Sequence, residues 1–299
     1  TIRNVGASGY ADVALRDAIN AGDVIGPRML ASGPAIGITG GHCDSNMLAP
    51  QYDEHAEGVA DGVDAVRAMV RKNIKYGADV IKYCGTGGVF SKGDTPGAQQ
   101  YTPEEVAALV DEAHMAGRRV AVHAHGAAGI KVALKAGVDT IEHASLIDDE
   151  GLELAKKNGA WLSMDIYNTE YTQTAGPKRG ELEEFLRKDR EVAQAQRDNF
   201  RKAVQKGVKL TMGTDTGVFP HADAPKQLAY MVQYGMTPMQ AIQAATKVGA
   251  EALGIEQTVG QIAPGYSADI VAVTRNPLED IHAMDSIEFV MTQGTVYKQ

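Results

Sequence analysis

The sequence repeats one junction five times, in which a helical segment ends at a glycine and an apolar strand follows. The junctions read KYGADVIK, MAGRRVAV, KAGVDTIE, KNGAWLS and QKGVKLTM. Glycine ends helices well because it readily adopts the left-handed conformation that other residues resist. Strands that alternate with helices pair in parallel, since each crossover helix returns the chain in the same direction. The repeat therefore predicts an α/β fold, a (β/α)8 barrel of the TIM type.

Seven strands are predicted, one fewer than a closed barrel of this type requires. They are apolar nearly throughout, as expected for strands that are buried on both faces. The predicted strands are 1–5, 28–32, 79–84, 119–124, 139–144, 160–166 and 209–214. Because an open arrangement would leave two unpaired edges, we expect the first barrel strand to be missing from this chain, before Thr1.

Helices are predicted between the strands, and the tail has a different pattern. Thr102 opens the clearest helix, because Pro103 fits its first turn and Glu105 completes a capping box. We divide the chain into a barrel over 1–257 and the C-terminal part of a small β-sandwich domain over 258–299, where no helix follows the strands. The predicted helices cover 102–117, 59–76, 127–136, 148–158, 180–206 and 237–253.

Four polar residues stand at the ends of predicted strands: Lys82, His123, His143 and Asp215. Barrel enzymes carry their chemistry at the C-terminal ends of the strands, so these side chains should meet in one cleft. Buried charges need partners, and imidazole and carboxylate groups suit zinc or a similar divalent ion. The pattern predicts a metal-dependent hydrolase. Lys82 fits such a site as a neutral amine or a carbamate, and an ion pair with Asp215 or a nearby carboxylate is an equally good interpretation.

Four further residues border the same strand ends. His125 follows His123 by two residues, so both point to one side of a strand, where one can bind metal and the other contact substrate or support the ligands. His42 lies in the glycine-rich loop GITGGHCD and either contacts substrate or caps a turn. Tyr167 is predicted to line the pocket, with an exposed loop tyrosine as the alternative. Arg3 could attract a carboxylate.

Charge and missing motifs exclude several classes of function. The net charge of −9 argues against nucleic acid as a partner, and no apolar run is long enough to span a membrane. The sequence contains no GxSxG, P-loop or HExxH motif. Cys43 and Cys84 are predicted to be buried thiols, because pairing requires the fold to bring them within disulfide reach. Localisation and oligomeric state stay open, with a homo-oligomer among the alternatives.

Several segments together resemble the amidohydrolase superfamily, in its Xaa-Pro dipeptidase and imidazolonepropionase-like branch, which includes ochratoxin-type amidases. The segments are IRNVGASG, GPRMLASG, ITGGH, GADVIKYCGTGGV, VAVHAHG, IEHAS, GTDTG and GQIAPGYSADIVAV. The resemblance implies two divalent metal ions, usually zinc, bridged by a carboxylated Lys82. It implies that His123 and His143 bind one metal, and that Asp215 binds the other and moves a proton. A His-x-His pair supplies the remaining ligands in this family, and none precedes Lys82 here.

The leading hypothesis is hydrolysis of an amide bond by a metal-bound hydroxide, with a dipeptide or an N-acyl amino acid as the small-molecule substrate. Metal coordination lowers the pKa of water from about 15.7 toward 7, and Asp215 would transfer the proton to the leaving amine. One alternative is hydrolysis of a cyclic amide of the imidazolone kind. A second is a barrel without catalytic activity, which the missing His-x-His favours.

Overall fold

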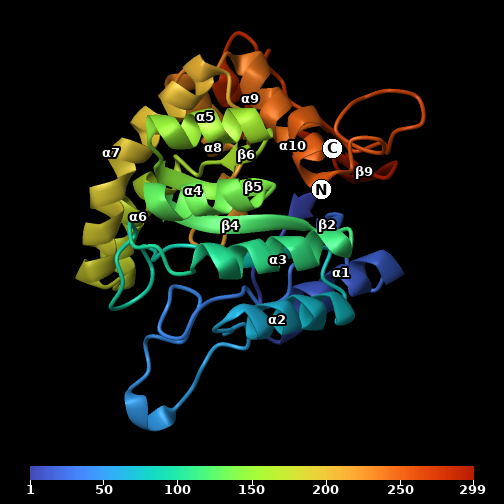
Figure 1. Cartoon of the computed structure of the whole chain (residues 1–299). Coiled ribbons are helices and arrows are strands. Elements are labelled where there is room, and N and C mark those ends of the chain that lie inside the picture. Colours follow the sequence, from blue (N-terminus) through green and yellow to red (C-terminus); the bar gives the residue numbers. More distant parts are fainter.

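A parallel sheet surrounded by helices forms the centre of the molecule, in a computed structural model that describes residues 1–299 (Figure 1). Strands β3 to β7 are hydrogen-bonded in chain order, each parallel to the next, and β1 and β2 form a separate parallel pair. All seven predicted strands are present, although most are shorter than predicted. They are β1 Ile2–Arg3, β2 Met29–Leu30, β3 Val80–Cys84, β4 Arg119–Gly126, β5 Thr140–Leu146, β6 Trp161–Ser163 and β7 Leu210–Thr211.

The two parallel sheets are joined by the segment that follows β2. The Ile36 amide donates a hydrogen bond to the Lys82 carbonyl, and the Cys84 amide donates to the Ile36 carbonyl, both at 2.8 Å. Arg3 on β1 also donates to Glu142 on β5 at 2.7 Å. A side chain of β1 thus reaches β5, although the two strands belong to different sheets. The prediction of an α/β fold with a parallel central sheet is therefore confirmed.

Ten α-helices cover the sheet, and they include every predicted helix. The helix predicted over 237–253 is broken at Thr246, whose φ of −126° and ψ of −97° are not helical. Three helices were not predicted: α1, α6 and α8. Among these, α6 is polar and carries Pro177 in its interior, two features that obscure a helical pattern. The helices are α1 Ala11–Ala21, α2 Val63–Lys75, α3 Pro103–Met115, α4 Ala127–Ala136, α5 Asp149–Asn158, α6 Asn168–Arg179, α7 Glu183–Lys206, α8 Lys226–Gln233, α9 Pro238–Ala245 and α10 Lys247–Leu253.

The local signals for helix ends are found as predicted. The Thr102 hydroxyl accepts a hydrogen bond from the Glu105 amide, and the Glu105 carboxylate accepts one from the Thr102 amide, which completes the capping box of α3. The five junction glycines all have positive φ, between 66° and 99°. Each lets its helix end and turn directly into the next strand, so the strand ends that follow lie at equivalent positions. These glycines are Gly77, Gly117, Gly137, Gly159 and Gly207.

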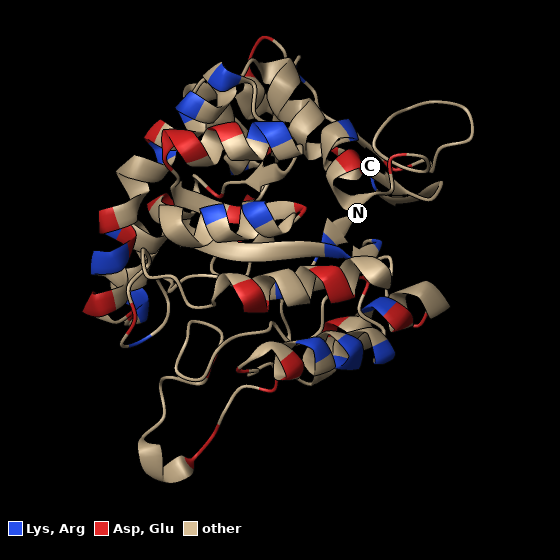
Figure 2. Cartoon of the chain, in the orientation of Figure 1, with Lys and Arg blue, Asp and Glu red and all other residues tan.

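Apolar side chains of the strands and of the inner helix faces form one large core. It includes Ile81 on β3, Val122 on β4, Ile141 on β5 and Leu162 on β6, none of which is exposed to solvent. Lysine, arginine, aspartate and glutamate lie mainly on the surrounding helices, whereas most of β4 carries none (Figure 2). The burial of whole strands explains why their sequences are apolar almost without interruption.

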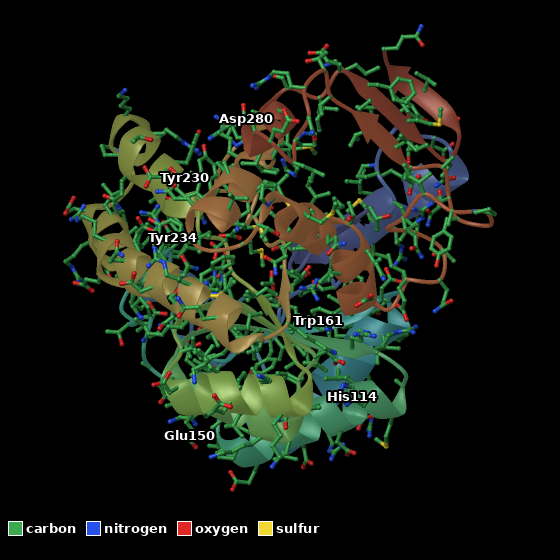
Figure 3. The ribbon with its side chains drawn as sticks, turned by 90° about the horizontal axis from the view of Figure 1, so that it is seen from above. His114, Glu150, Trp161, Tyr230, Tyr234 and Asp280 are labelled. Carbon is green, nitrogen blue, oxygen red and sulfur yellow. A yellow bond between two sulfur atoms is a disulfide. The ribbon has the colours of Figure 1, made fainter.

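The helices on one side are also joined by stacked aromatic and cationic groups. Tyr230 on α8 and Tyr234 directly after it lie side by side with ring centroids 6.5 Å apart (Figure 3). The Arg197 guanidinium of α7 lies 5.5 Å from the Tyr230 ring and 5.7 Å from the Tyr234 ring, and it pairs with Glu170 of α6 at 2.7 Å. Arg197 thus holds α6, α7 and α8 together beside the carboxyl ends of the strands.

The tail forms a separate antiparallel sheet in the order β10-β9-β8. Its strands are β8 Ile270–Ala272, β9 Phe289–Thr292 and β10 Thr295–Lys298. Arg28 pairs with Asp269 at 2.7 Å and so connects the tail to the start of β2. No helix of the chain has both the length and the apolar character that crossing a membrane requires.

Candidate active site

A cavity of about 1460 Å³ is lined by residues near the carboxyl ends of the strands, together with residues from the start of the chain and from the tail. The four residues predicted as metal ligands, Lys82, His123, His143 and Asp215, all line it, and so do His42 and His125. The predicted convergence of strand-end residues is therefore found. Their roles as ligands stay predictions, which the geometry below supports to different degrees.

Three histidines form the centre of the site. His123 and His125 lie on β4 and His143 lies on the neighbouring β5, and the candidate ligand atoms of the three lie within 4.8 Å of one another. The ring centroids of His123 and His143 are 4.6 Å apart, and those of His125 and His143 are 4.7 Å apart. A cluster of imidazoles at this spacing can hold a divalent metal ion.

Each of these imidazoles has one ring nitrogen bound to a protein oxygen. His123 Nε2 donates to the Gly87 carbonyl at 3.2 Å, and His125 Nδ1 lies 2.8 Å from the Ser145 hydroxyl. His143 Nδ1 donates to Asp165 at 2.9 Å. The other nitrogen of each ring is left for a further partner. Metal-binding histidines are commonly oriented in this way, so the residues present fit a metal ion.

Burial and neighbouring charges shift the pKa values of the three histidines in different directions. Burial, reinforced by the neighbouring imidazoles, lowers the pKa of both His123 and His125 far below the usual value. Burial also opposes the charged form of His143, but the charge and hydrogen bond of Asp165 outweigh it and raise the pKa of His143. His123 and His125 are thus neutral at neutral pH, as metal ligands must be, whereas the negative charge of Asp165 attracts a cation to His143.

Asp165 is a residue of the site that the sequence did not reveal. Its carboxylate accepts hydrogen bonds from His143, from Gln196 at 2.8 Å and from Asn168 at 3.1 Å. It also forms a second group of candidate ligands with His143 and Asp215. Burial would raise the pKa of Asp165, but the adjacent His143 lowers it well below its usual range. Its position near the end of the apolar run AWLSMDI was the available signal, since the other strand-end residues share that position.

Asp215 follows β7 in a strained backbone conformation with a φ of 55°. Its Oδ2 atom accepts a hydrogen bond from Asn168 at 3.0 Å, and its side chain faces the cavity. Burial by the surrounding protein raises the pKa of Asp215, although the nearby His143 opposes the shift. The residue is exposed and lines the cavity, so its carboxylate is accessible to a bound ligand. Asp215 is therefore suited to accept and release a proton.

Lys82 is buried, and its amine forms no ion pair with Asp215. Burial lowers the pKa of Lys82, although the negative charge of Glu142 opposes the shift. Glu142 is instead paired with Arg3, which also donates to the Thr140 hydroxyl at 3.0 Å. Arg3 does attract a carboxylate, as predicted, but the carboxylate belongs to the protein. The ion pair considered as an alternative for Lys82 is not formed, and a neutral amine fits its surroundings.

His42 lies against this cluster, with its ring stacked on His123 at a centroid distance of 4.0 Å. Burial lowers the pKa of His42 to about 4. The next residue, Cys43, forms a disulfide with Cys84 at the end of β3, with the two Cα atoms 6.0 Å apart. The prediction of two buried thiols is therefore wrong. The loop folds back on β3, which brings together two cysteines that are far apart in sequence.

Tyr167 does not line the cavity. Its ring packs against Phe219 and Tyr230, with centroids 5.1 Å and 5.3 Å away, and its side chain is mostly buried. Tyr167 is therefore not the pocket residue that was predicted, and it is not the exposed loop residue of the alternative either. Nothing in its geometry supports a role in substrate binding.

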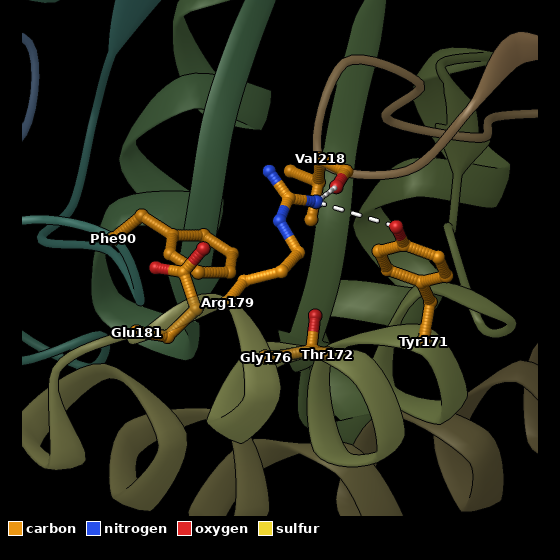
Figure 4. Close-up of a pocket in the computed structure, with 7 residues that line it drawn as sticks. All are labelled: Phe90, Tyr171, Thr172, Gly176, Arg179, Glu181 and Val218. Carbon is orange, nitrogen blue, oxygen red and sulfur yellow. Dashed lines mark hydrogen bonds between the residues drawn. The ribbon is translucent and has the colours of Figure 1, made fainter.

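A small pocket beside the mouth of the cavity contains Arg179 at the end of α6 (Figure 4). The guanidinium donates to the Val218 carbonyl at 3.1 Å and to the Tyr171 hydroxyl at 3.3 Å. Phe90 and Val218 line both this pocket and the cavity. Arg179 thus connects α6 to the loop after β7, which contains Asp215.

The profile of the amidohydrolase family matches residues 1–297. The chain belongs to this family. It is 34% identical to an ochratoxinase from Aspergillus niger over 318 residues, which cover 98% of this chain and 66% of that relative. The chain thus spans a little less than two thirds of the length of this curated relative.

Two solved structures are also similar over the whole chain. One is a Xaa-Pro dipeptidase with methionine bound in its active site, with 42% identity and a TM-score of 0.94, of which 75% is covered. The other is a prolidase complexed with N-methylphosphonate-L-proline, with 32% identity and a TM-score of 0.91, and again 75% is covered. These relatives confirm the branch of the family to which the sequence was compared.

Proposed function

We propose that this protein hydrolyses the amide bond of a dipeptide or an N-acyl amino acid. The observation that carries the proposal is the convergence of His123, His125, His143, Asp165 and Asp215 as two groups of ligand atoms in one cavity. The ochratoxinase and prolidase relatives support an amide as the bond that is cleaved. We further propose that the strands belong to a (β/α)8 barrel over 1–257 and that 258–299 contributes to a β-sandwich domain.

We propose Lys82, His123, His143 and Asp215 as the residues that hold two divalent metal ions, with zinc suited to the imidazole donors. In this arrangement Lys82 is carboxylated, which its unpaired amine and its lowered pKa favour. The bound metal would polarise the amide carbonyl and lower the pKa of a water molecule.

The protein groups around the ligands then orient and move protons. Asn168 holds Oδ2 of Asp215, so Oδ1 is left to accept the proton of the attacking water and to pass it to the leaving nitrogen. The raised pKa of Asp215 brings it closer to neutrality and so suits this double role. Asp165 and Gln196 fix the orientation of the His143 ring, while His125 and His42 line the cavity where substrate would bind.

Replacement of Asp215 by asparagine tests the proton transfer. We expect kcat on a dipeptide to fall by about a thousandfold, because acid–base groups contribute about 10²–10⁴, while at least one metal stays bound. Asp198→Asn, on the exposed surface of α7, is the matched control and should keep full activity. Near-normal turnover of the Asp215 variant would refute the role of this carboxylate.

A panel of dipeptides, N-acyl amino acids and cyclic amides separates the proposed substrates from the imidazolone-like alternative. Metal analysis separates both from a barrel without catalytic activity. If the folded protein binds no metal and hydrolyses none of these substrates, the proposed function is wrong.

A further inference from the structure

Three polar side chains form a hydrogen-bonded chain that ends at His42. Lys188 on α7 donates to Asp94 at 2.8 Å, Ser91 lies 2.7 Å and 2.8 Å from the two Asp94 oxygens, and His42 Nδ1 lies 2.7 Å from the Ser91 hydroxyl. The side chains of Lys188 and Asp94 are only 1% and 8% exposed. A buried lysine and aspartate are costly unless they are paired, so this arrangement is a built feature of the fold.

The direction of each hydrogen bond follows from the donors available. Asp94, paired with Lys188, is a carboxylate and can only accept. Ser91 has a single hydroxyl hydrogen, and it must point to Asp94, because otherwise oxygen lone pairs would face each other at 2.7 Å. The Ser91 oxygen therefore accepts from His42, whose Nδ1 must carry a hydrogen. In a neutral imidazole the hydrogen is then absent from Nε2, which presents a lone pair.

The position of the His42 ring is also fixed from both sides. Its ring stacks on His123, and it lies so close to Gly88 that a Cβ atom there would be 2.2 Å from two ring atoms. The His42 amide donates to Gln100 at 3.1 Å, which holds the backbone. His42 Nε2 has no hydrogen-bond partner in the protein, although the ring lines the cavity. A ring held this firmly, with one unused acceptor, is prepared for a ligand that donates.

We infer that Ser91, Asp94 and Lys188 are positioning residues that hold His42 as the Nδ1–H tautomer, so that Nε2 accepts a hydrogen bond from a substrate ammonium group. The inference rests on the proposed function for the identity of the ligand, and it selects dipeptides with a free α-ammonium over N-acyl amino acids. Asp165 and Asp215 line the same cavity and favour a cationic group there, whereas the charge of Glu142 is paired with Arg3.

The tautomer can be measured directly by long-range ¹H–¹⁵N correlation spectra of the zinc-loaded full chain with ¹⁵N-histidine, with His42 assigned by comparison with His42→Gln. We expect a protonated Nδ1 and an unprotonated Nε2 at pH 7.5. In Ser91→Ala the Nε2–H form should increase. In Asp94→Asn the new amide donates to Ser91, whose hydrogen turns to Nδ1, so the tautomer should invert. If Ser91→Ala fails to fold, Asp94→Asn decides the question.

The ligand is tested with L-methionine and with 4-(methylsulfanyl)butanoate, which has the same carboxylate and side chain but no ammonium. We expect only methionine to shift the Nε2 resonance, and Ser91→Ala to weaken its binding about tenfold, the effect of one hydrogen bond. Ser45→Ala, in an exposed part of the His42 loop, is the control and should change neither.

An Nε2–H tautomer or a doubly protonated ring in the unaltered protein overturns the inference, and so does an equal shift with both ligands. Neither measurement requires turnover. Absence of amide hydrolysis with the expected tautomer and the expected methionine response would therefore refute the proposed function alone.

Discussion

Replacement of Lys188 by methionine tests whether the buried ion pair behind His42 stabilises the fold. The ammonium lies 2.8 Å from Asp94 and 2.6 Å from the Ser91 carbonyl. Methionine fills most of the same volume but leaves the 8%-exposed Asp94 side chain charged and without its cation. Removal of one partner of a buried pair typically costs about 3–5 kcal/mol. We expect the lower end, about 3 kcal/mol, because Asp94 keeps its hydrogen bonds from Ser91 and from the Gly88 amide.

The assay is urea unfolding followed by circular dichroism at several pH values. Burial alone would raise the pKa of Asp94, but Lys188 and the hydrogen bonds lower it in the folded protein. In the unaltered chain Asp94 therefore contributes stability above the pKa of an unfolded aspartate, about 3.9, which is lost as the pH falls through the lower folded value. In Lys188→Met, burial is no longer opposed by the cation, the pKa of Asp94 rises, and protonation relieves the destabilisation. The difference between the two proteins should thus be largest at neutral pH and shrink in acid.

The double variant Asp94→Asn/Lys188→Met removes both charges and is the matched control. It should regain much of the lost free energy of unfolding, because the buried charge of Asp94 is gone and only Glu184, whose side chain is 33% exposed, has lost its cation. A loss below about 1 kcal/mol in Lys188→Met at pH 7, the size expected for an exposed pair, would refute the reasoning. A loss that is independent of pH would refute it as well.

Two further predictions concern the surroundings of His42, namely Gly88 in the loop after β3 and the disulfide of Cys43. Gly88→Ala would place a methyl group 2.2–2.6 Å from three His42 ring atoms, so the ring must move. We expect kcat/KM on a dipeptide to fall about tenfold or more. Gly97→Ala in the same loop as Gly88 is the control and should be neutral, because the atom nearest to the added methyl group would be 3.8 Å away. Reduction of the Cys43–Cys84 disulfide, which closes a loop of 41 residues, should lower the free energy of unfolding by about 3–4 kcal/mol. Urea unfolding with and without reductant measures this loss, and an unchanged midpoint would contradict it; the doubly cysteine-free variant should not respond to reductant.

Local patterns in the sequence were sufficient to locate the strands and the face of the sheet that carries the site. Helix-ending glycines such as Gly137 and Gly207 mark the start of the next strand, because the backbone conformation that they adopt is local. The ends of those strands then gave His143 and Asp215, which line the same cavity. These predictions succeeded because a parallel sheet places equivalent strand ends along one edge.

Contacts between distant segments could not be read from such patterns. Lys188 and Asp94 are 94 residues apart, and only the packing of α7 against the loop after β3 joins them. Gln196 reaches Asp165 for the same reason, and the sequence of α7 reads as an ordinary amphipathic helix. The Cys43–Cys84 pair depends on the path of a long loop, for which periodicity gives no signal.

The backbone of the site is strained in a way that the fold alone does not require. Six residues other than glycine have positive φ, and three of them are His143, Ala144 and Asp215. Such conformations cost about 1–3 kcal/mol each and persist only where the surroundings impose them. Glycine would remove the strain at His143 and Asp215, but it would also remove two candidate ligand side chains, since His143 belongs to both groups of candidate ligands in the cavity and Asp215 belongs to one. The strained residues thus include an imidazole and a carboxylate whose candidate ligand atoms lie within 4.8 Å of each other. If the proposed function is right, the strain is retained because both side chains are needed at this point of the cavity.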